Sequence, residues 1–189
     1  MVIVRPASRF EDVASILDPS GNERACWCLA YRVTSAEYSA LRGEARAERV
    51  RRLCAGEFAP GVLAYDGATP VGWCGVSPRS SMERLKRSRT MPPLDDLAVW
   101  SVVCFVVRSS HRGQGVSAAL LAGAVDYARS CGAPAVEGYP VDPEGARIGS
   151  SAAHVGTTSL FEAAGFERIR PTGARADRRV RWLVRRDLR

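Results

Sequence analysis

The stretch AVWSVVCFVV-RSSHRGQG-VSAALLAGAVDYAR, residues 98–129, decides the fold. Its first part, residues 98–107, is rich in β-branched and aromatic side chains and is apolar on both faces, which predicts a strand in the middle of a sheet. Its last part, residues 116–129, repeats apolar residues every third or fourth position, which predicts an amphipathic helix. A basic turn that contains glycine, residues 108–115, joins the two.

The turn between Arg108 and Gly115 is where we expect chemistry. Glycine lets the backbone turn tightly and approach a ligand closely. The first N–H groups of the following helix have no partner within the helix and lie at the positive end of its dipole. Arg108 and Arg112 add positive charge. Together these features predict a phosphate site, while the plainer interpretation is an ordinary turn from strand to helix.

Two well-known phosphate motifs fit this turn poorly. The pattern GxxxxGK[ST] does not occur in the sequence, which excludes a P-loop. Gly113, Gly115 and Ala118 match a loose dinucleotide fingerprint, with Glu137 near its acidic position. However, five residues separate the strand from the first glycine, which is too many for that tight turn. The chain before the strand also indicates an antiparallel hairpin rather than a βαβ repeat.

A third motif fits better. The sequence RGQGVS, from Arg112 to Ser117, resembles the R/Q-x-x-G-x-G/A pyrophosphate motif of the GNAT superfamily of acyl-CoA N-acyltransferases, with Ser117 in place of the final Gly/Ala. The segment LFEAAGF, residues 160–166, resembles the closing L-Y-E-x-x-G-F segment of that family. The resemblance covers about Gly61 to Val184. It implies a single α/β (α+β) domain over residues 1–189, with a mixed, mostly antiparallel, splayed sheet flanked by helices.

The resemblance also implies a ligand and a reaction. Acetyl-CoA would be the cosubstrate, and no metal would take part. The pantetheine arm would pair with backbone groups of Phe105, Val106 and Val107. The pyrophosphate would lie on the turn, whose implied cofactor-binding residues are Arg112, Gly113, Gln114, Gly115, Val116 and Ser117. A primary amine of a small molecule would attack the thioester carbonyl directly, in a ternary complex.

Two positions depart from the catalytic pattern of the family. Phe161 stands where members often have a tyrosine acid, and Ser101 stands where many have a glutamate base. We predict Glu137 as a substitute base, because partial burial raises the pKa of a carboxylate; the alternative is a strand residue that faces outward. The implied substrate pocket contains Cys28, Asp96, Ser101, Tyr139 and Thr157.

Two groups of residues on the acceptor side have alternative interpretations. Cys28 belongs to an apolar segment, residues 26–31, which by the resemblance walls the acceptor site or, alternatively, fills the core. The carboxylates of Asp95, Asp96 and Asp142 would attract a cationic amine, although loop carboxylates are usually only solvated.

The rest of the chain predicts further elements around this centre. The expected strands are 2–5, 61–65, 71–77, 135–139, 166–170 and 178–186, and the expected helices are 9–17, 34–54 and 156–164. Ser8 would cap the first helix, and Thr34 with Glu37 would form a capping box for the second. Strand 135–139 should run parallel to the central strand because a crossover connects them. We interpret residues 78–93 as a mobile flap with a short helix near 82–87.

Composition narrows the class of protein. The 189 residues are 46% hydrophobic and 25% charged, which is typical of one globular domain. No apolar run reaches the ~18 residues that cross a bilayer, so we expect a cytoplasmic protein with no membrane partner. The six cysteines fit that compartment as free thiols, and with only two histidines a zinc site is not expected.

The net charge of +7 is concentrated at the end of the chain, where residues 166–189 contain nine arginines and three acidic residues. Such a tail could bind nucleic acid. However, Val180, Trp182 and Val184 alternate with arginines, which predicts a half-buried strand with arginines on its solvent face.

We therefore expect a small-molecule amine as the partner and no nucleic acid, and we leave a homodimer open. The alternatives are a protein N-terminal or lysine acetyltransferase, and a non-catalytic acyl-CoA-binding module. Ser101 and Phe161 favour the second alternative, because they remove the usual catalytic helpers.

Overall fold

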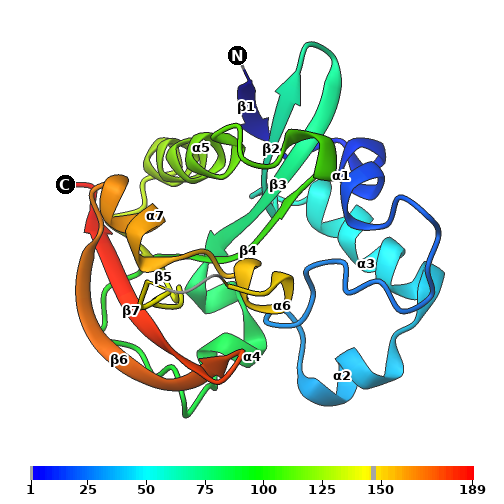
Figure 1. Ribbon diagram of the computed structural model, residues 1–189. Coiled ribbons are helices and arrows are strands. Elements are labelled where there is room, and N and C mark those ends of the chain that lie inside the picture. Colours follow the sequence, from blue (N-terminus) through cyan, green and yellow to red (C-terminus); the bar gives the residue numbers. More distant parts are fainter. Residues whose placement is uncertain (1, 146–147) are drawn as a thin grey trace.

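The protein is built on one mixed sheet in the computed structural model, which describes residues 2–145 and 148–189 (Figure 1). The strands are β1 Ile3–Pro6, β2 Gly61–Asp66, β3 Thr69–Pro78, β4 Trp100–Val107, β5 Ala135–Gly138, β6 Glu167–Ala176 and β7 Arg179–Asp187. The helices are α1 Phe10–Leu17, α2 Ser35–Ala40, α3 Gly43–Cys54, α4 Glu83–Lys86, α5 Val116–Ser130, α6 Ser150–Ala153 and α7 Thr158–Ala163. Two single 3₁₀ turns, η1 Arg79–Ser81 and η2 Ser109–His111, precede α4 and α5.

The seven strands lie in the order β1-β2-β3-β4-β5-β7-β6. Neighbouring strands are antiparallel except β4 and β5, which are parallel and joined through α5. This confirms both the central position of the strand in the opening stretch and the predicted crossover. The fold is a mixed, mostly antiparallel α/β sheet flanked by helices, as the resemblance implied.

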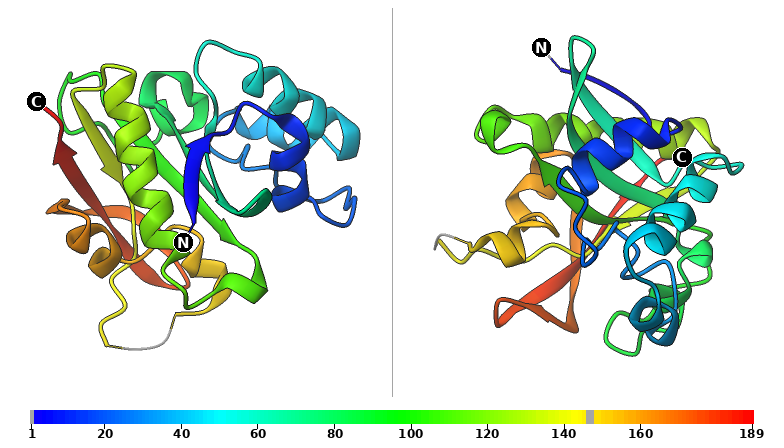
Figure 2. Two further views of the ribbon diagram at one scale, coloured as in Figure 1. Left: turned by 90° about the horizontal axis from the view of Figure 1, so that it is seen from above. Right: turned by 90° about the vertical axis from the view of Figure 1, so that its right-hand side faces the viewer.

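Helices cover the two faces of the sheet (Figure 2). On one face α5 packs against β1, β2 and β3, and α7 adds the ring of Phe161 to the same apolar core. On the other face α1, α3 and α4 contribute the buried side chains of Val13, Val50 and Leu85. Because β4 is covered on both faces, its run of apolar residues is buried on both sides.

The capping box at Thr34 and Glu37 is confirmed, but the single helix expected to follow it is interrupted. Leu41 and Arg42 are extended, and α3 begins at Gly43, which has a φ of +43°. The N–H of Gly43 donates to the carbonyl of Glu23 instead of continuing the first helix. A contact with a distant loop therefore ends α2. The predicted cap at Ser8 is also wrong, since Arg9 is the N-cap residue of α1 and makes no side-chain cap.

The connection from residue 78 to 93 is anchored rather than loose, which contradicts the expected mobile flap. Met82, Leu85 and Met91 are buried in the core. The guanidinium group of Arg79 donates to the carbonyl oxygens of Leu85 and Met91 at 3.1 and 2.7 Å. Apolar side chains therefore anchor the segment in the core, and the buried guanidinium group of Arg79 links two parts of its backbone. The short helix predicted near 82–87 is confirmed as α4.

The terminal hairpin is confirmed, but one of its arginines is not on a solvent face. Arg181 is only 4% exposed, and its Nε donates to the carbonyl oxygen of Tyr139 at 2.7 Å. Leu183 on β7 belongs to the core under α1 and α3, whereas Val184 belongs to the core under α5. The alternation along β7 predicted a strand with one solvent-exposed face. Because both faces of β7 are covered, Arg181 lies inside the protein.

The ring of Phe161 lies directly on the backbone of Gly138, where a Cβ atom would approach Cε1 of that ring to 2.2 Å. We expect Gly138→Ala to lower the free energy of unfolding by about 1–3 kcal/mol, because overpacking a buried contact forces side chains or backbone to shift. Denaturant unfolding followed by circular dichroism measures this loss. Gly173→Ala on β6 is the control, since its Cβ would meet Thr90 only at ordinary contact distances from 3.4 Å. Equal stability of the two variants would contradict the packing argument.

Candidate functional site

The strands β4 and β5 separate part-way along the sheet. They pair only at Trp100 with Val136, Ser101 with Glu137, and Val102 with Gly138. Beyond these pairs, β5 gives way to Tyr139 and a loop, while β4 continues to Val107. The splay implied by the resemblance is therefore present, and the last residues of β4 face an opening instead of a neighbouring strand.

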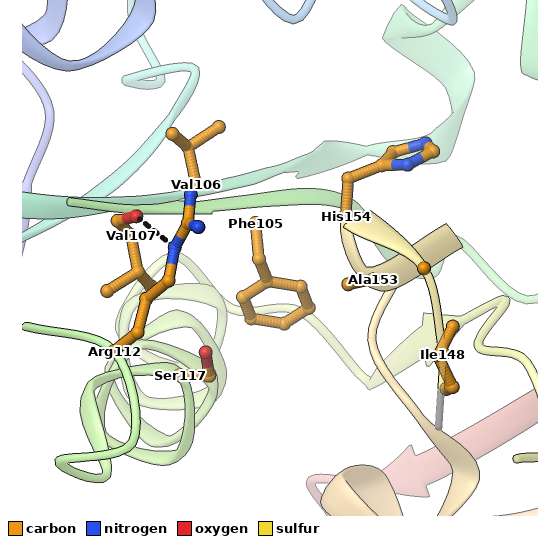
Figure 3. Close-up of a pocket in the computed structure, with 9 residues that line it drawn as sticks. Phe105, Val106, Val107, Arg112, Ser117, Ile148, Ala153 and His154 are labelled. Atoms are coloured by element: carbon orange, nitrogen blue, oxygen red, sulfur yellow. Dashed lines mark hydrogen bonds between the residues drawn. The ribbon is translucent and has the colours of Figure 1, made fainter. Parts of the chain in front are cut away.

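A pocket of about 780 Å³ occupies this opening (Figure 3). Arg112 and Ser117 lie on one side of it, at the start of α5, and Ile148, Ala153 and His154 lie on the other side, around α6. The end of β4 forms the wall between them. Of the residues that we predicted for cofactor binding, five line the pocket: Phe105, Val106, Val107, Arg112 and Ser117.

The remaining predicted residues shape the turn above the pocket. Gly113 and Gly115 have φ values of +74° and +77°, a conformation that favours glycine. Gly115 is the N-cap of α5, so the unpaired N–H groups of the first helical turn begin here. Val116 is buried in the core under α5, and Gln114 is exposed, its side-chain amide donating to the carbonyl of Ser110 at 2.9 Å.

Two backbone groups of the β4 segment already have partners within the chain. The N–H of Phe105 donates to the carbonyl of His154 at 2.7 Å, and the carbonyl of Val107 accepts from Nε of Arg112 at 3.3 Å. A ligand that pairs with this edge of β4 would have to replace these contacts. The segment that carries His154 thus covers the edge in this structure.

The side chain at the family's usual acid position is a packing residue. Phe161 is fully buried, and its ring makes edge contacts with Phe105 and Phe166 at centroid distances of 6.1 and 5.0 Å. It holds β4, β5 and the start of β6 together at the point where the first two separate. A phenyl ring has no proton to donate, so Phe161 does not serve as the acid that the resemblance places at this position.

Polar side chains on the opposite face of the splay form a connected group, which we call the β5 polar cluster: Arg79, Asp95, Glu137, Tyr139 and Arg185. Glu137 is 0% exposed, and its Oε1 accepts from Nε and Nη2 of Arg185 at 3.1 and 2.7 Å. Its Oε2 accepts from the Tyr139 hydroxyl at 3.2 Å. That hydroxyl also accepts from Nε of Arg79 at 3.2 Å, and Arg185 pairs with Asp95.

Burial and charge set the protonation of this cluster. Burial raises the pKa of Tyr139, and the neighbouring charge of Glu137 adds to that effect, while Arg79 opposes it. The hydrogen bond from Arg185 lowers the pKa of Asp95. The hydrogen bonds to Asp95 and Glu137 raise the pKa of Arg185. Tyr139 is therefore a neutral hydroxyl at neutral pH, placed between a buried carboxylate and a buried guanidinium group.

A family model described as the acetyltransferase (GNAT) family matches residues 27–143. The chain belongs to the GNAT acetyltransferase family. The sequence search of curated proteins gave no match.

Solved structures share the fold over nearly the whole chain. One is a putative acetyltransferase from Salmonella typhimurium with its cofactor acetyl-CoA, with a TM-score of 0.57, 14% identity, and coverage of 100% of this chain and 94% of that one. Another is the ribosomal-protein-alanine N-acetyltransferase from Brucella melitensis, with a TM-score of 0.57, 16% identity, and coverage of 98% and 99%. A third is the NatC complex bound to Gag peptide and CoA, with a TM-score of 0.56, 14% identity, and coverage of 100% and 99%.

The residues predicted for the substrate pocket of this GNAT protein do not all gather in one place. Ser101 pairs in register with Glu137, and Tyr139 follows two residues later, so these two lie at the splay. The Ser101 hydroxyl is fully buried and has no hydrogen-bond partner in the described chain. Asp96 is exposed on the loop before β4. Thr157 caps α7, where its hydroxyl accepts from the N–H of Leu160.

Cys28 is a core residue beside buried polar groups. It is 5% exposed, and its Sγ lies 2.7 Å from the point where a Cβ on Gly75 would sit. A hydrogen bond from the Cys104 thiol lowers the pKa of Cys28 to about 6, burial opposes this shift, and the charge of Arg32 adds to it. The backbone at Cys28 has a φ of +54°, so a tight left-handed turn brings the thiol there.

Sequence reasoning missed the buried arginines at this site. Arg79 and Arg181 both contact Tyr139, and Arg181 also donates to the hydroxyl of Tyr31. Nothing in the sequence around Arg79 distinguishes it from the exposed arginines nearby. The aromatic residues Tyr31 and Tyr139 were the available signal, since a buried phenol needs a polar partner.

Other expectations concern metals and membranes. In residues 2–145 and 148–189, no group of three or more His, Cys, Asp or Glu side chains is arranged to hold a metal ion. Within the same part of the chain, no helix has both the length and the apolar character needed to cross a membrane.

Several arginines of the C-terminal tail make contacts within the protein, while Arg168, Arg175, Arg178 and Arg189 are exposed. Arg168 pairs with Asp142 and Glu162, Arg185 pairs with Glu137 and Asp95, and Arg186 donates to the carbonyl of Ala164. The ion pairs offset the charges of Arg168 and Arg185, whereas the hydrogen bond to a carbonyl leaves the charge of Arg186 in place.

The lowered pKa of Cys28 predicts that the free energy of unfolding depends on pH. Because the pKa of Cys28 falls to about 6 in the folded protein and is about 8.5 in an unfolded chain, the thiolate stabilises the fold fully above about pH 8.5. That contribution is lost as the pH falls through 6. We expect the free energy of unfolding of the natural protein to rise between pH 6 and 8.5 relative to Cys28→Ser, measured by urea unfolding. Cys131→Ser, at a partly exposed thiol, is the control. Parallel profiles for the natural protein and Cys28→Ser would refute this account.

Proposed function

We propose that the protein transfers an acetyl group from acetyl-CoA to the primary amine of a small molecule, by direct attack in a ternary complex. The observation that carries this proposal is the pocket of about 780 Å³ where β4 leaves β5. The pocket connects an edge of β4 with the positive start of α5. CoA has an extended thiol arm and a pyrophosphate, so the arm can pair with the strand edge while the pyrophosphate binds at the start of the helix. The cofactor named for the Salmonella structure, which shares this fold, agrees with that ligand.

In this proposal each part of acetyl-CoA meets a different part of the pocket. The pyrophosphate binds at the first turn of α5, with Arg112 and Ser117, where N–H groups and positive charge converge. The pantetheine arm follows Phe105, Val106 and Val107 and takes over the backbone contacts that His154 and Arg112 now make. The thioester then lies near the start of the splay, at Val102 and Gly138.

A compact acceptor fits the surroundings of that point better than a long chain. Ser101 and Tyr139 are 0% and 1% exposed, and the side chains of Met82, Leu85 and Met91 fill the core on the same face. Little room is left next to the thioester, which supports a small amine. The Gag peptide bound to the NatC complex and the ribosomal-protein-alanine activity named for the Brucella structure make a protein N-terminus the competing acceptor.

We propose that Glu137 accepts the proton of the attacking amine through the hydroxyl of Tyr139. The amine nitrogen bonds to the carbonyl carbon, the C–S bond breaks, and the CoA thiolate leaves. A thiolate is a good leaving group, because the pKa of a thiol is about 8.5. The Tyr139 hydroxyl bonds to Oε2 of Glu137, and Tyr139 is the first residue after β5. This relay supplies the proton transfer that Ser101 and Phe161 do not supply.

We also propose that residues 1–189 act as one domain and work in the cytoplasm. The continuous sheet from β1 to β6 supports one domain. All six cysteines are free thiols, which is usual in a reducing compartment.

The first test is ligand binding. We expect acetyl-CoA at about 100 times its dissociation constant to stabilise the protein by about 2.7 kcal/mol, seen as a higher melting temperature. Arg112→Gln should weaken this binding roughly tenfold, because a charged donor near the pyrophosphate is lost. Arg129→Gln at the other end of α5, where Arg129 pairs with Asp126, is the control. An equal loss in both variants, or no stabilisation at all, would contradict the assigned pocket.

The same assay decides between acceptors. CoA release is measured with a panel of small primary amines and with peptides that have free N-termini or lysines. Turnover with small amines supports the proposal, and turnover with peptides alone supports the competing acceptor. Binding of acetyl-CoA without turnover across the panel would favour a non-catalytic binding module.

The proposed relay has its own variants. Tyr139→Phe should lower kcat about 100-fold or more and leave the KM for acetyl-CoA unchanged, because the relay hydroxyl is lost and the ring is kept. Glu137→Gln should lower kcat by a similar factor, because the relay loses its proton acceptor. It also breaks the buried pair with Arg185, which costs about 3–5 kcal/mol, so its fold is checked by circular dichroism. Tyr65→Phe is the matched control, since that hydroxyl also bonds to a carboxylate, Asp12, at 2.9 Å. Unchanged kcat in Tyr139→Phe would exclude the relay.

A further inference from the structure

A second pocket, of about 250 Å³, lies at the other end of the central strands. Its walls come from the end of β3, the end of α3 and the loop before β2. Ser77 and Pro78 in this wall pair with Ser101 and Trp100 at the start of β4, whereas the acetyl-CoA pocket uses the last residues of β4. At about 3.3 Å per residue, the two pockets are separated by most of the length of that strand.

The lining of this second pocket is basic. Its charged residues are Arg32, Arg49, Arg52 and Glu57, so three positive groups face one negative group. Arg52 is partly balanced by Glu48, which accepts from its Nε at 3.0 Å. Arg49 makes no ion pair among the described residues. The pocket therefore carries an excess of positive charge.

Arg32 at the base of the pocket is the unusual member. It is 6% exposed, its Nη1 donates to the Ser77 hydroxyl at 2.8 Å, and its Nη2 donates to the carbonyl of Pro60. No carboxylate in residues 2–145 and 148–189 forms an ion pair with it. Buried charges are normally paired, because removing an ion from water costs several kcal/mol. The Cys28 thiol beside Arg32, whose pKa falls to about 6, supplies one compensating charge, while the two hydrogen-bond partners of Arg32 that line the pocket, Ser77 and Pro60, are neutral.

We propose that this pocket binds a small anionic group, a phosphate or a carboxylate, held by Arg32 from below and by Arg49 and Arg52 from α3. An arginine fork matches the oxygen atoms of either group. The volume accepts a phosphate or a short carboxylic acid. This site does not depend on the proposed acetyl transfer.

The two sources of such a group give different kinetics. If the anion is part of the acceptor molecule, inorganic phosphate competes with the amine. If it is a separate effector, phosphate changes the rate without changing the KM for the amine. In both cases the anion binds in the pocket, and the comparison identifies where it comes from.

The binding test uses isothermal titration of inorganic phosphate, and separately of succinate, in a buffer low in chloride. We expect Arg49→Gln combined with Arg52→Gln to weaken binding about tenfold or more, because two charged contacts are lost. Arg51→Gln is the matched control, since Arg51 lies between them on α3 with the same charge and does not line the pocket. It should change binding less than twofold.

Two further variants keep the test decisive. Arg112→Gln removes charge from the start of α5 and, in a titration with acetyl-CoA saturating its own pocket, should leave phosphate binding at the second pocket unchanged. Arg32→Lys retains the charge but loses the two-pronged donor group of arginine, so this variant should weaken binding if it folds. If it does not fold, the variants at Arg49 and Arg52 on α3 test the proposal. Three results would overturn the proposal: no binding of either anion, loss of binding in Arg112→Gln alone, or equal weakening by Arg51→Gln.

Discussion

The parallel pairing of β4 and β5 stops at Val102 and Gly138, and the candidate pocket at the end of β4 depends on this early end. The ring of Phe161 covers Gly138 so closely that no side chain fits there, and the same ring packs against Phe105 on β4. One aromatic residue thus fixes both strands from one face where they separate. A hydroxyl at this position would lie in an apolar core. The protein keeps the packing and places its polar chemistry on the opposite face of the sheet.

Buried arginines organise that opposite face. Arg32, Arg46, Arg79 and Arg181 are each less than a tenth exposed. Their guanidinium groups donate largely to main-chain carbonyls of irregular segments, such as those of Ala25, Leu85 and Tyr139. Five donors in one plane suit this task, because a single side chain satisfies several carbonyl groups that no helix or strand pairs. The loops around β3 and β4 are consequently tied to the sheet rather than left open.

The parts of the fold that sequence reasoning predicted are those fixed by neighbours in the chain. The central strand, the glycine turn and α5 follow from local pattern, as does the capping box at Thr34. The break at Gly43 depends on the carbonyl of Glu23, and the burial of Arg181 depends on Tyr139. Such contacts join distant residues, and a single sequence carries no signal for them. Five predicted cofactor residues line one pocket for the same reason: they belong to one continuous strand and turn.

The charges on the face with Ser101 and Tyr139 differ from those that the sequence suggested. Asp95 and Asp142, which would attract a cationic amine, are paired with Arg185 and Arg168. Arg32, Arg79 and Arg181 are buried on the same face, and Glu137 is the buried carboxylate among them. A polycation would be repelled from this surface, because like charges in a medium of low dielectric interact strongly. For the acetyl transfer that we propose, these charges would favour an acceptor whose reacting amine is attached to an uncharged or acidic body over one rich in lysine or arginine.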